Sequence, residues 1–261
     1  MFKHINIKYI ALSLGLLGFV ASCDHISEDD RYIETTPVVT ARKVLLEEFT
    51  GQFCPNCPEG HAVIESLEEQ YGDELIVVSI HAGHFGVSAP AGLMEPEGDE
   101  YANRWGIEAY PSAVVDRNSG ALGRNQWSTA VRDEISKETT LYLGLYAEQS
   151  ADYKNIEITT NLGSPEARNG SLQLWVVEND IVTFQQDGGN IIPDYTHNNV
   201  FRACVNGLWG QEVALPANEE VTLNNSIAIQ DDWVLRNVYI VGFYYDASGV
   251  IQVERCPVSN L

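Results

Sequence analysis

The chain has 261 residues, of which 15 are lysine or arginine and 37 are aspartate or glutamate, so its formal net charge is −22 at pH 7. This charge argues against nucleic acid as a partner and against basic patches that hold anionic surfaces. The length allows one large domain or two modest domains.

The first 22 residues have the pattern of a bacterial export signal. Lys3 and Lys8 precede an apolar run at positions 9–20, which is too short to span a bilayer as a retained helix. The run closes on small residues and Cys23, an arrangement that resembles the lipobox of bacterial lipoproteins. In those proteins the signal is cleaved before the cysteine, which carries acyl chains that anchor it. We therefore expect Cys23 to be lipidated, with an ordinary secretory signal as the alternative.

Residues 23–40 are polar and carry an acidic run at positions 27–30. We expect this segment to be a flexible tether. The acidic run resembles the surface-export tags of some lipoproteins, whereas Asp24 after Cys23 would indicate inner-membrane retention under the enteric rule. We favour an outer membrane lipoprotein and leave open whether it faces the periplasm or the cell surface.

Cys54-Pro55-Asn56-Cys57 follows a strand predicted at residues 42–49. Two cysteines two residues apart, between a strand and a helix, can form a reversible disulfide. The helix N-terminus stabilises a thiolate at Cys54, which we expect to be the more exposed sulfur. Pro55 suits the first helical position. Cys57, one turn into the helix, is then the buried resolving thiol.

The next elements predict a βαβ unit around this pair. Apolar residues at helical spacing follow up to Tyr71, and residues 75–80 form an apolar run typical of a strand covered on both faces. The cysteines then lie at the carboxyl end of the first strand, where ligands and chemistry collect in open α/β sheets.

The segment at residues 101–112 resembles the one that precedes the cis-proline of thioredoxins, because it reads Ala-x-Arg-aromatic-Gly-Ile-x-x-aromatic-Pro-Ser. This resemblance implies a cis Tyr110–Pro111 bond beside the cysteines, where the backbone next to Pro111 would pair with an extended peptide. It also implies that Glu48 is the buried acid that takes the proton of the resolving cysteine. The neighbouring Glu47 leaves that assignment ambiguous, and a partly exposed strand residue is the alternative reading of Glu48.

A strand at 113–115, a turn at 117–120 and a helix at 126–138 complete a thioredoxin-like α/β domain over residues 41–138. The chain departs from small thioredoxins at Phe53, where a tryptophan is usual, and in having Pro-Asn between the cysteines. Residues 84–97 form an inserted loop that either roofs the site or decorates the surface.

A metal site is the competing interpretation of the motif. Cys54 and Cys57, with His81 and His84 downstream, have the ligand types of a zinc site. The cysteines lie at a strand-to-helix junction rather than in a zinc knuckle, so we predict neither a metal nor a cofactor.

From residue 139 onward the pattern alternates with period two, as at 156–162, 172–176 and 239–245, with turn clusters between the runs. This predicts an all-β immunoglobulin-like sandwich over residues 139–261. Cys204 and Cys256 fall on polar strand faces, which makes them a candidate disulfide. Tyr195, His197, Asn198, Asn199 and Trp209 form a polar-aromatic cluster that would bind a ligand or, more commonly, be a sandwich loop.

Nearly the whole mature chain resembles the Omp28-related outer membrane lipoprotein family. The shared features are the lipobox, the acidic tether, the run Glu-Glu-Phe-Thr-Gly-Gln-x-Cys-x-Asn-Cys-Pro and the β-rich C-terminal half, and they are sharpest at 48–58 and 99–117. The resemblance implies an architecture, a thioredoxin-like domain followed by a sandwich, rather than an established reaction.

These observations predict a lipid-anchored extracytoplasmic thiol–disulfide oxidoreductase. Its partners would be thiols or disulfides of envelope or surface proteins, and its membrane contact would be the lipid anchor. Cys54 would attack, Cys57 would resolve the mixed disulfide, and Pro111 and Glu48 would assist. The alternative is a non-enzymatic surface-binding or adhesion lipoprotein in which Cys54–Cys57 is static. The sequence carries no catalytic triad, phosphate loop, dinucleotide fold or calcium loop.

Overall fold

The structure is a computed structural model that describes residues 40–259. The predicted export signal, Cys23 and the tether up to residue 39 lie outside the described residues. The described residues form one compact unit. Among the described residues, no helix is both long and apolar enough to cross a membrane.

The first half of the described chain contains the predicted strand–helix–strand unit. Strands β1 and β2 are parallel and buried along their whole length, and β3 pairs with β1 in the antiparallel direction. The elements in order are β1 (Val44–Thr50), α2 (Cys57–Tyr71), β2 (Leu75–His81), α3 (Pro96–Trp105), β3 (Ser112–Val115), β4 (Leu122–Gly123) and α4 (Trp127–Ile135).

The second half consists of strands, several of them at the positions that the period-two pattern predicts. These elements are β5 (Tyr142–Gln149), β6 (Asn155–Ser164), β7 (Arg168–Glu178), β8 (Ile181–Asp187), β9 (Asn190–His197), β10 (Val200–Cys204), β11 (Gln211–Leu215), β12 (Glu219–Ala228), β13 (Val238–Asp246) and β14 (Gly249–Pro257). The chain changes from helices to strands between α4 and β5, close to the predicted boundary after residue 138. The two domains on either side of that boundary stay a prediction.

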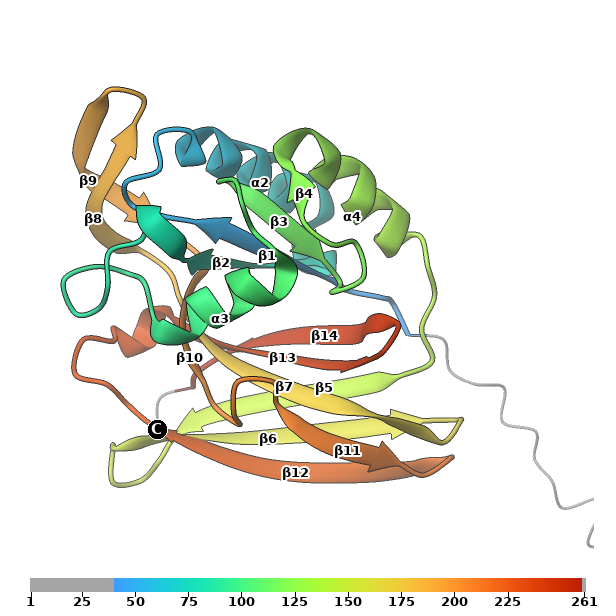
Figure 1. Ribbon diagram of the computed structural model, residues 1–261. Coiled ribbons are helices and arrows are strands. Elements are labelled where there is room, and N and C mark those ends of the chain that lie inside the picture. The colour runs from blue at the N-terminus through green and yellow to red at the C-terminus, as the bar shows by residue number, and fades with distance from the viewer. Residues whose placement is uncertain (1–39, 260–261) are drawn as a thin grey trace, which may run out of the picture. The chain divides into compact units, whose positions relative to one another are not determined.

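The predicted fold class, a thioredoxin-like α/β domain followed by a separate immunoglobulin-like sandwich, is wrong. A single nine-stranded mixed sheet runs through both halves in the order β14-β13-β7-β10-β2-β1-β3-β4, with β11 added beside β7 (Figure 1). Four of its strands come from the first half of the chain and five from the second.

The sheet is continuous because β10 pairs with the outer side of β2. The two strands run parallel with Val200 opposite Ser79, and the Ser79 amide donates to the Asn199 carbonyl at 2.6 Å. A shared core follows, since Ile76 and Val78 of the first half pack in one cluster with Trp175 and Phe243 of the second. The periodicity of a strand does not reveal such a distant partner.

Figure 1 shows the layers of this unit. Three hydrophobic clusters pack between them. Helices α2 and α4 cover one face of β1, β2 and β3, while α3 packs on the opposite face. A second, three-stranded sheet in the order β12-β6-β5 packs against β7 and β13. A sandwich-like packing therefore exists, but one of its layers is part of the mixed sheet.

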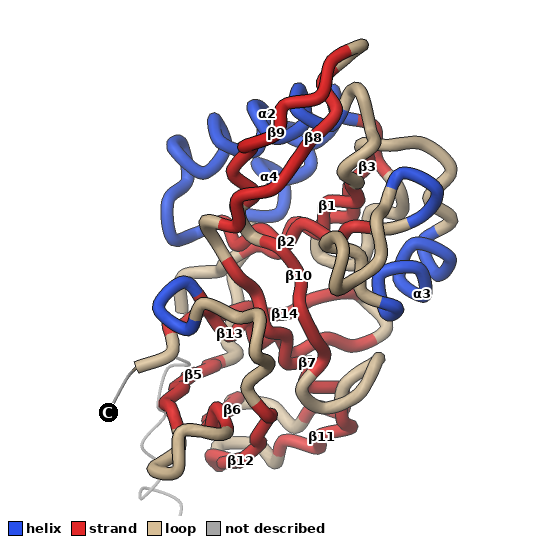
Figure 2. Tube along the Cα trace, turned by 90° about the vertical axis from the view of Figure 1, so that its left-hand side faces the viewer, coloured by secondary structure: helices blue, strands red, loops and turns tan. Residues whose placement is uncertain are grey.

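Strands β8 and β9 form a hairpin of their own, which belongs to neither of the larger sheets. Figure 2 shows this hairpin rising beyond the end of β10, along the side on which α2 lies. The hairpin contributes directly to the surroundings of the cysteine pair.

Candidate functional site

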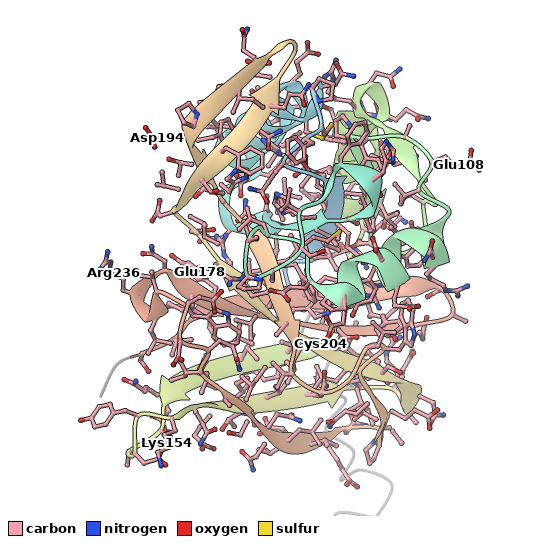
Figure 3. All side chains as sticks on the ribbon, turned by 60° about the vertical axis from the view of Figure 1, so that its left-hand side comes forward. Glu108, Lys154, Glu178, Asp194, Cys204 and Arg236 are labelled. Atoms are coloured by element: carbon pink, nitrogen blue, oxygen red, sulfur yellow. A yellow bond between two sulfur atoms is a disulfide. The ribbon has the colours of Figure 1, made fainter. Side chains whose placement is uncertain are left out.

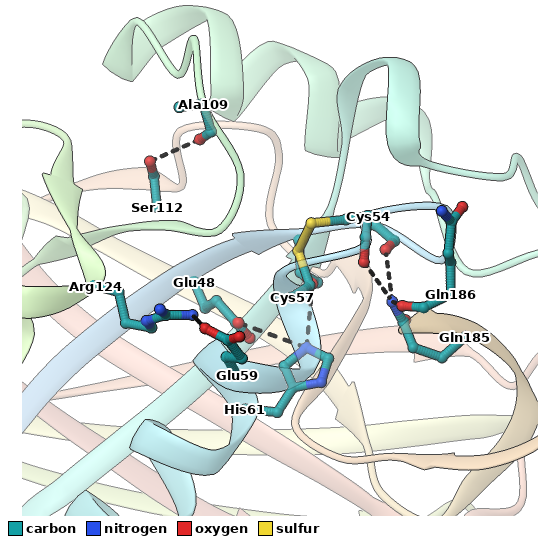
Figure 4. The surroundings of a disulfide bond; sticks show 12 residues. Glu48, Cys54, Cys57, Glu59, His61, Ala109, Ser112, Arg124, Gln185 and Gln186 are labelled. Carbon is teal, nitrogen blue, oxygen red and sulfur yellow. Dashed lines mark hydrogen bonds and ion pairs between the residues drawn. A yellow bond between two sulfur atoms is a disulfide. The ribbon is translucent and has the colours of Figure 1, made fainter. Parts of the chain in front are cut away.

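Cys54 lies in the loop that joins β1 to α2, Cys57 is the first residue of α2, and the two form a disulfide (Figure 4). The helix begins at Cys57 rather than at Pro55. Pro58 lies in its first turn, where the missing N–H of proline removes no helical hydrogen bond. Both cysteines are 0% exposed. The expectation that Cys54 would be the more exposed sulfur is therefore wrong, because other segments of the chain cover the loop.

The β8–β9 hairpin provides part of this cover. The buried Gln185 side chain donates from Nε2 to the carbonyl oxygens of Cys54 and Gly51, at 3.1 and 3.2 Å. Main-chain bonds join the same two segments, from Gln186 to Gln52 at 2.8 Å and from Gly188 to Pro55 at 2.9 Å. Figure 4 shows Gln185 and Gln186 reaching the disulfide loop from the hairpin.

Aromatic packing and the inserted loop complete the cover. The rings of Phe53 and Phe184 lie 5.0 Å apart, centroid to centroid. The Phe53 amide donates to the Phe85 carbonyl at 2.9 Å, and the Leu93 amide donates to Oε1 of Gln52 at 3.0 Å. The segment before α3, which the sequence left as either roof or decoration, thus contacts the cysteine loop directly.

Pro111 lies against the first turns of α2. The Tyr110–Pro111 peptide bond is cis. A Cβ built on Gly60 would lie 2.9 Å from Cγ of Pro111 and 3.2 Å from the Trp127 ring, so only glycine fits the helix this closely to the proline. Pro111 is therefore close to the cysteine helix, while its pairing with an incoming peptide stays a prediction.

The structure places Glu47 and Glu48 on opposite faces of β1. Glu48 faces α2 and is fully buried, and its Oε2 accepts a hydrogen bond from the Ser79 hydroxyl at 2.7 Å. Glu47 is buried on the other face, where its Oε1 accepts from Nε of Arg117 at 2.7 Å. Strand alternation resolves the ambiguity that the sequence left between the two acids.

Burial raises the pKa of Glu48 to about 8, against an ordinary value of 4.5, and the hydrogen bond from Ser79 offsets only part of that effect. Its Oε1 has no hydrogen-bond partner within the described part of the chain and lies 3.5 Å from Nε2 of His61. Burial lowers the pKa of His61 to about 4. At neutral pH the carboxyl is therefore mainly protonated and the imidazole neutral.

Glu48 and His61 line a cavity of about 400 Å³ between α2 and the base of the β8–β9 hairpin. Nδ1 of His61 lies 2.7 Å from the Tyr195 hydroxyl on β9. His81 and His197 also line the cavity, with ring centroids 5.4 Å apart, and both ring nitrogens of His81 lack a partner. Asn198 and Asn199 line it too, whereas Trp209 of the predicted polar-aromatic cluster lies elsewhere.

The arrangement of the described side chains does not support a metal site at the cysteine motif. Within residues 40–259, no three histidine, cysteine, aspartate or glutamate side chains are arranged to hold a metal ion. Cys54 and Cys57 are bonded to each other, and His81 belongs to the cavity rather than to the cysteine loop.

Cys204 and Cys256 are both free thiols, so the structure lacks the candidate disulfide between these two residues. Cys204 on β10, labelled in Figure 3, packs into the cluster around Trp175 and lies 3.0 Å from the Tyr101 hydroxyl. Cys256 on β14 packs into the cluster between the two sheets. The two side chains thus belong to different cores, and the expectation that both sit on polar strand faces is also wrong.

Sequence reasoning missed three residues of this site, namely Gln52, His61 and Gln185. Gln185 lies in a strand of mixed polarity, and no local pattern separates a buried amide from an exposed one. His61 lies on a helix face that would be solvent-exposed without the hairpin. Each acquires its role from a contact with a segment more than 100 residues away along the chain.

The model of the family described as outer membrane protein Omp28 matches residues 98–260. No curated protein matches the chain. Among solved structures, HBP35 of Porphyromonas gingivalis is 16% identical with a TM-score of 0.67, over 84% of this chain and 76% of that one. A protein from Agrobacterium tumefaciens is 12% identical with a TM-score of 0.53, over 84% and 96%. These two similarities show the fold alone.

A domain of the outer membrane lipoprotein Omp28 from Porphyromonas gingivalis is 21% identical, over 46% of this chain and 88% of that one, with a TM-score of 0.34. The family assignment depends instead on the sequence match, which covers more than half of the chain.

Replacing Gln185 tests whether the hairpin controls access to the disulfide. Gln185→Ala removes two hydrogen bonds to the cysteine loop, each worth on the order of 1 kcal/mol, so we expect dithiothreitol to reduce Cys54–Cys57 about tenfold faster. Alkylation at timed intervals, followed by mass spectrometry, measures this rate. Gln186→Ala is the matched control, because the side-chain amide of Gln186 donates to Gly188 within the hairpin and its main-chain bond to Gln52 is kept. Equal rates in the two variants would contradict the covering role.

Glu48→Gln tests the protonation state of the buried acid. The pKa of Glu48 is raised on folding, so the folded protein holds a proton that the unfolded chain has lost, and stability falls as pH rises from 4.5 to about 8. Glutamine carries no such proton. We therefore compare the two free energies of unfolding, variant minus wild type. This difference should increase by up to about 1.4 kcal/mol per pH unit between pH 6.5 and 8, because only the wild type loses stability there. Urea titrations at each pH measure it, and a pH-independent difference would refute the assignment.

Proposed function

Because the chain belongs to the outer membrane protein Omp28 family, and is an outer membrane lipoprotein, we propose that it exchanges thiols and disulfides with proteins outside the cytoplasm. Cys54–Cys57 is the exchanging bond in this proposal. The partners are envelope or surface proteins that carry a dithiol or a disulfide.

The observation that carries this proposal is the fully buried Glu48 in the surroundings of the disulfide (Figure 4). A buried carboxyl with an unpartnered oxygen costs stability, and a static disulfide would not need one. A proton acceptor with a pKa near 8 suits a cysteine thiol, whose ordinary pKa is about 8.5. His61 and Tyr195 connect this carboxyl to the hairpin.

The oxidised state seen here accepts two electrons from a partner dithiol. A partner thiolate attacks one sulfur of Cys54–Cys57, which forms a mixed disulfide and releases the other cysteine as a thiolate. The second partner thiol then attacks the mixed disulfide, so the partner leaves oxidised and both cysteines are reduced. The same steps in reverse reduce a partner disulfide. Glu48 would exchange a proton with Cys57 in either direction.

A partner protein reaches the sulfurs only when the cover moves. The β8–β9 hairpin pairs only with itself and exposes Val182 and Ile191, so it has few buried contacts of its own to lose. An isolated two-stranded hairpin is marginally stable, and the bonds from Gln185, Gln186 and Gly188 hold this one against the cysteine loop. Opening of the hairpin is therefore the expected step before exchange.

The second candidate function is a non-enzymatic surface protein in which Cys54–Cys57 is a static bond. The complete burial of both sulfurs favours this alternative. In that case the disulfide would fix the loop on which the hairpin rests, and removal of both cysteines would leave partner binding unchanged.

Trapping of mixed disulfides separates the two candidates. In the full chain in its outer membrane, we expect Cys57→Ala to accumulate protein adducts through Cys54 that disappear on reduction, because the resolving thiol is gone. The Cys54→Ala and Cys57→Ala double variant is the control, and it should form none through this site. Non-reducing gels measure the adducts. If Cys57→Ala forms no adducts and the protein does not reduce insulin, the bond is static.

A further inference from the structure

A second cavity, of about 450 Å³, lies where the end of α3, the turn after β3 and the turn after β13 meet. It is separate from the cysteine site, and it belongs to the opposite face of β1. The side chains that line it include those of Arg104, Trp105, Arg117, Trp209, Tyr245 and Asp246.

Arg117 forms the inner wall of this cavity. Its guanidinium is nearly inaccessible, since the residue is 8% exposed, and its Nε donates to Oε1 of Glu47 at 2.7 Å. Five aromatic rings surround it, with centroids 4.6–5.8 Å from Cζ, and they belong to Tyr101, Trp175, Trp209, Phe243 and Tyr245. The rings and the ion pair fix the orientation of the guanidinium.

Three buried donors at this cavity have no acceptor among residues 40–259. They are Nη1 and Nη2 of Arg117 and Nε1 of Trp105, which all belong to residues that line the cavity. A buried donor without a partner destabilises the folded protein, and a charged donor does so more strongly. Since Arg and Trp side chains donate and do not accept, a molecule that satisfies these groups must supply hydrogen-bond acceptors.

Two arginines and two acids surround the cavity, and the donors that lack a partner include both Nη groups of Arg117. Arg104 lies at the mouth, with its Cζ 5.6 Å from the centre of the Trp105 ring. Asp246 also lines the cavity, but its Oδ1 accepts from the amide and hydroxyl of Ser248 within the same turn. Glu47 uses one oxygen on Arg117 and leaves both Nη groups free.

We propose that this cavity binds a small carboxylate that carries a flat or ring-shaped apolar face. The two Nη groups of Arg117 match the two oxygens of a carboxylate in a bidentate pair. The ring face would lie against Tyr245 and Trp209, and Trp209 is 37% exposed at the opening. Aromatic acids and sugar acids share this chemistry.

Titration with defined probes tests the site. Benzoate and glucuronate are added to the full chain, with benzyl alcohol and glucose as their neutral counterparts, and binding is followed by tryptophan fluorescence and calorimetry. We expect at least one of the two acids to bind saturably and its neutral counterpart to bind at least tenfold more weakly. Binding of benzoate alone assigns an aromatic acid, and binding of glucuronate alone a sugar acid.

Two variants localise the binding. Arg117→Lys keeps the positive charge but loses the two Nη donors that would pair with a carboxylate, so we expect at least a tenfold loss of affinity. Ala247→Trp fills the exposed mouth without touching Arg117, and it should abolish binding in a protein whose circular dichroism is unchanged. Binding of neither acid, equal binding of acid and neutral counterpart, or unchanged affinity in a folded Ala247→Trp variant would overturn the proposal.

Discussion

Ser79 joins the two halves of this protein and also supports its buried acid. Its amide donates to the Asn199 carbonyl, where β10 meets β2, and its hydroxyl donates to Glu48. The first bond makes one sheet from strands of both halves. Because the β8–β9 hairpin directly precedes β10 in the chain, the same bond also brings that hairpin to the disulfide loop. The pairing thus places the hairpin beside the disulfide loop, where the bonds from Gln185, Gln186 and Gly188 hold it.

Strand β1 distributes its two glutamates between two sites. Glu48 points toward α2 and opens into the histidine-lined cavity, while Glu47 points toward the second half of the chain and holds Arg117 among aromatic rings. Both acids are fully buried, so each requires compensation from a segment that is remote in sequence. The mixed sheet is therefore both part of the protein's core and the element that separates the disulfide and its buried acid from a donor-rich cavity.

The sequence predicts local features well and distant contacts poorly. The alternation of a strand, the spacing of the cysteines and the segment before Pro111 are local, and they led to the correct β1–α2–β2 unit and to the bonded cysteine pair. The pairing of Val200 with Ser79 is not local, so the fold class was wrong. The same limit explains why Cys54 was expected to be exposed and why Gln185 was missed, since both depend on where the hairpin docks.

The central claim is that Cys54–Cys57 exchanges with other proteins although the hairpin covers it. The reduction potential of this couple, measured in full-length protein against glutathione buffers, tests the claim most directly. The account predicts a value within the range of exchanging thiol proteins, roughly −120 to −270 mV. A potential below about −300 mV, typical of structural disulfides, would contradict it and leave the bond as a fixed support for the loop beneath the hairpin.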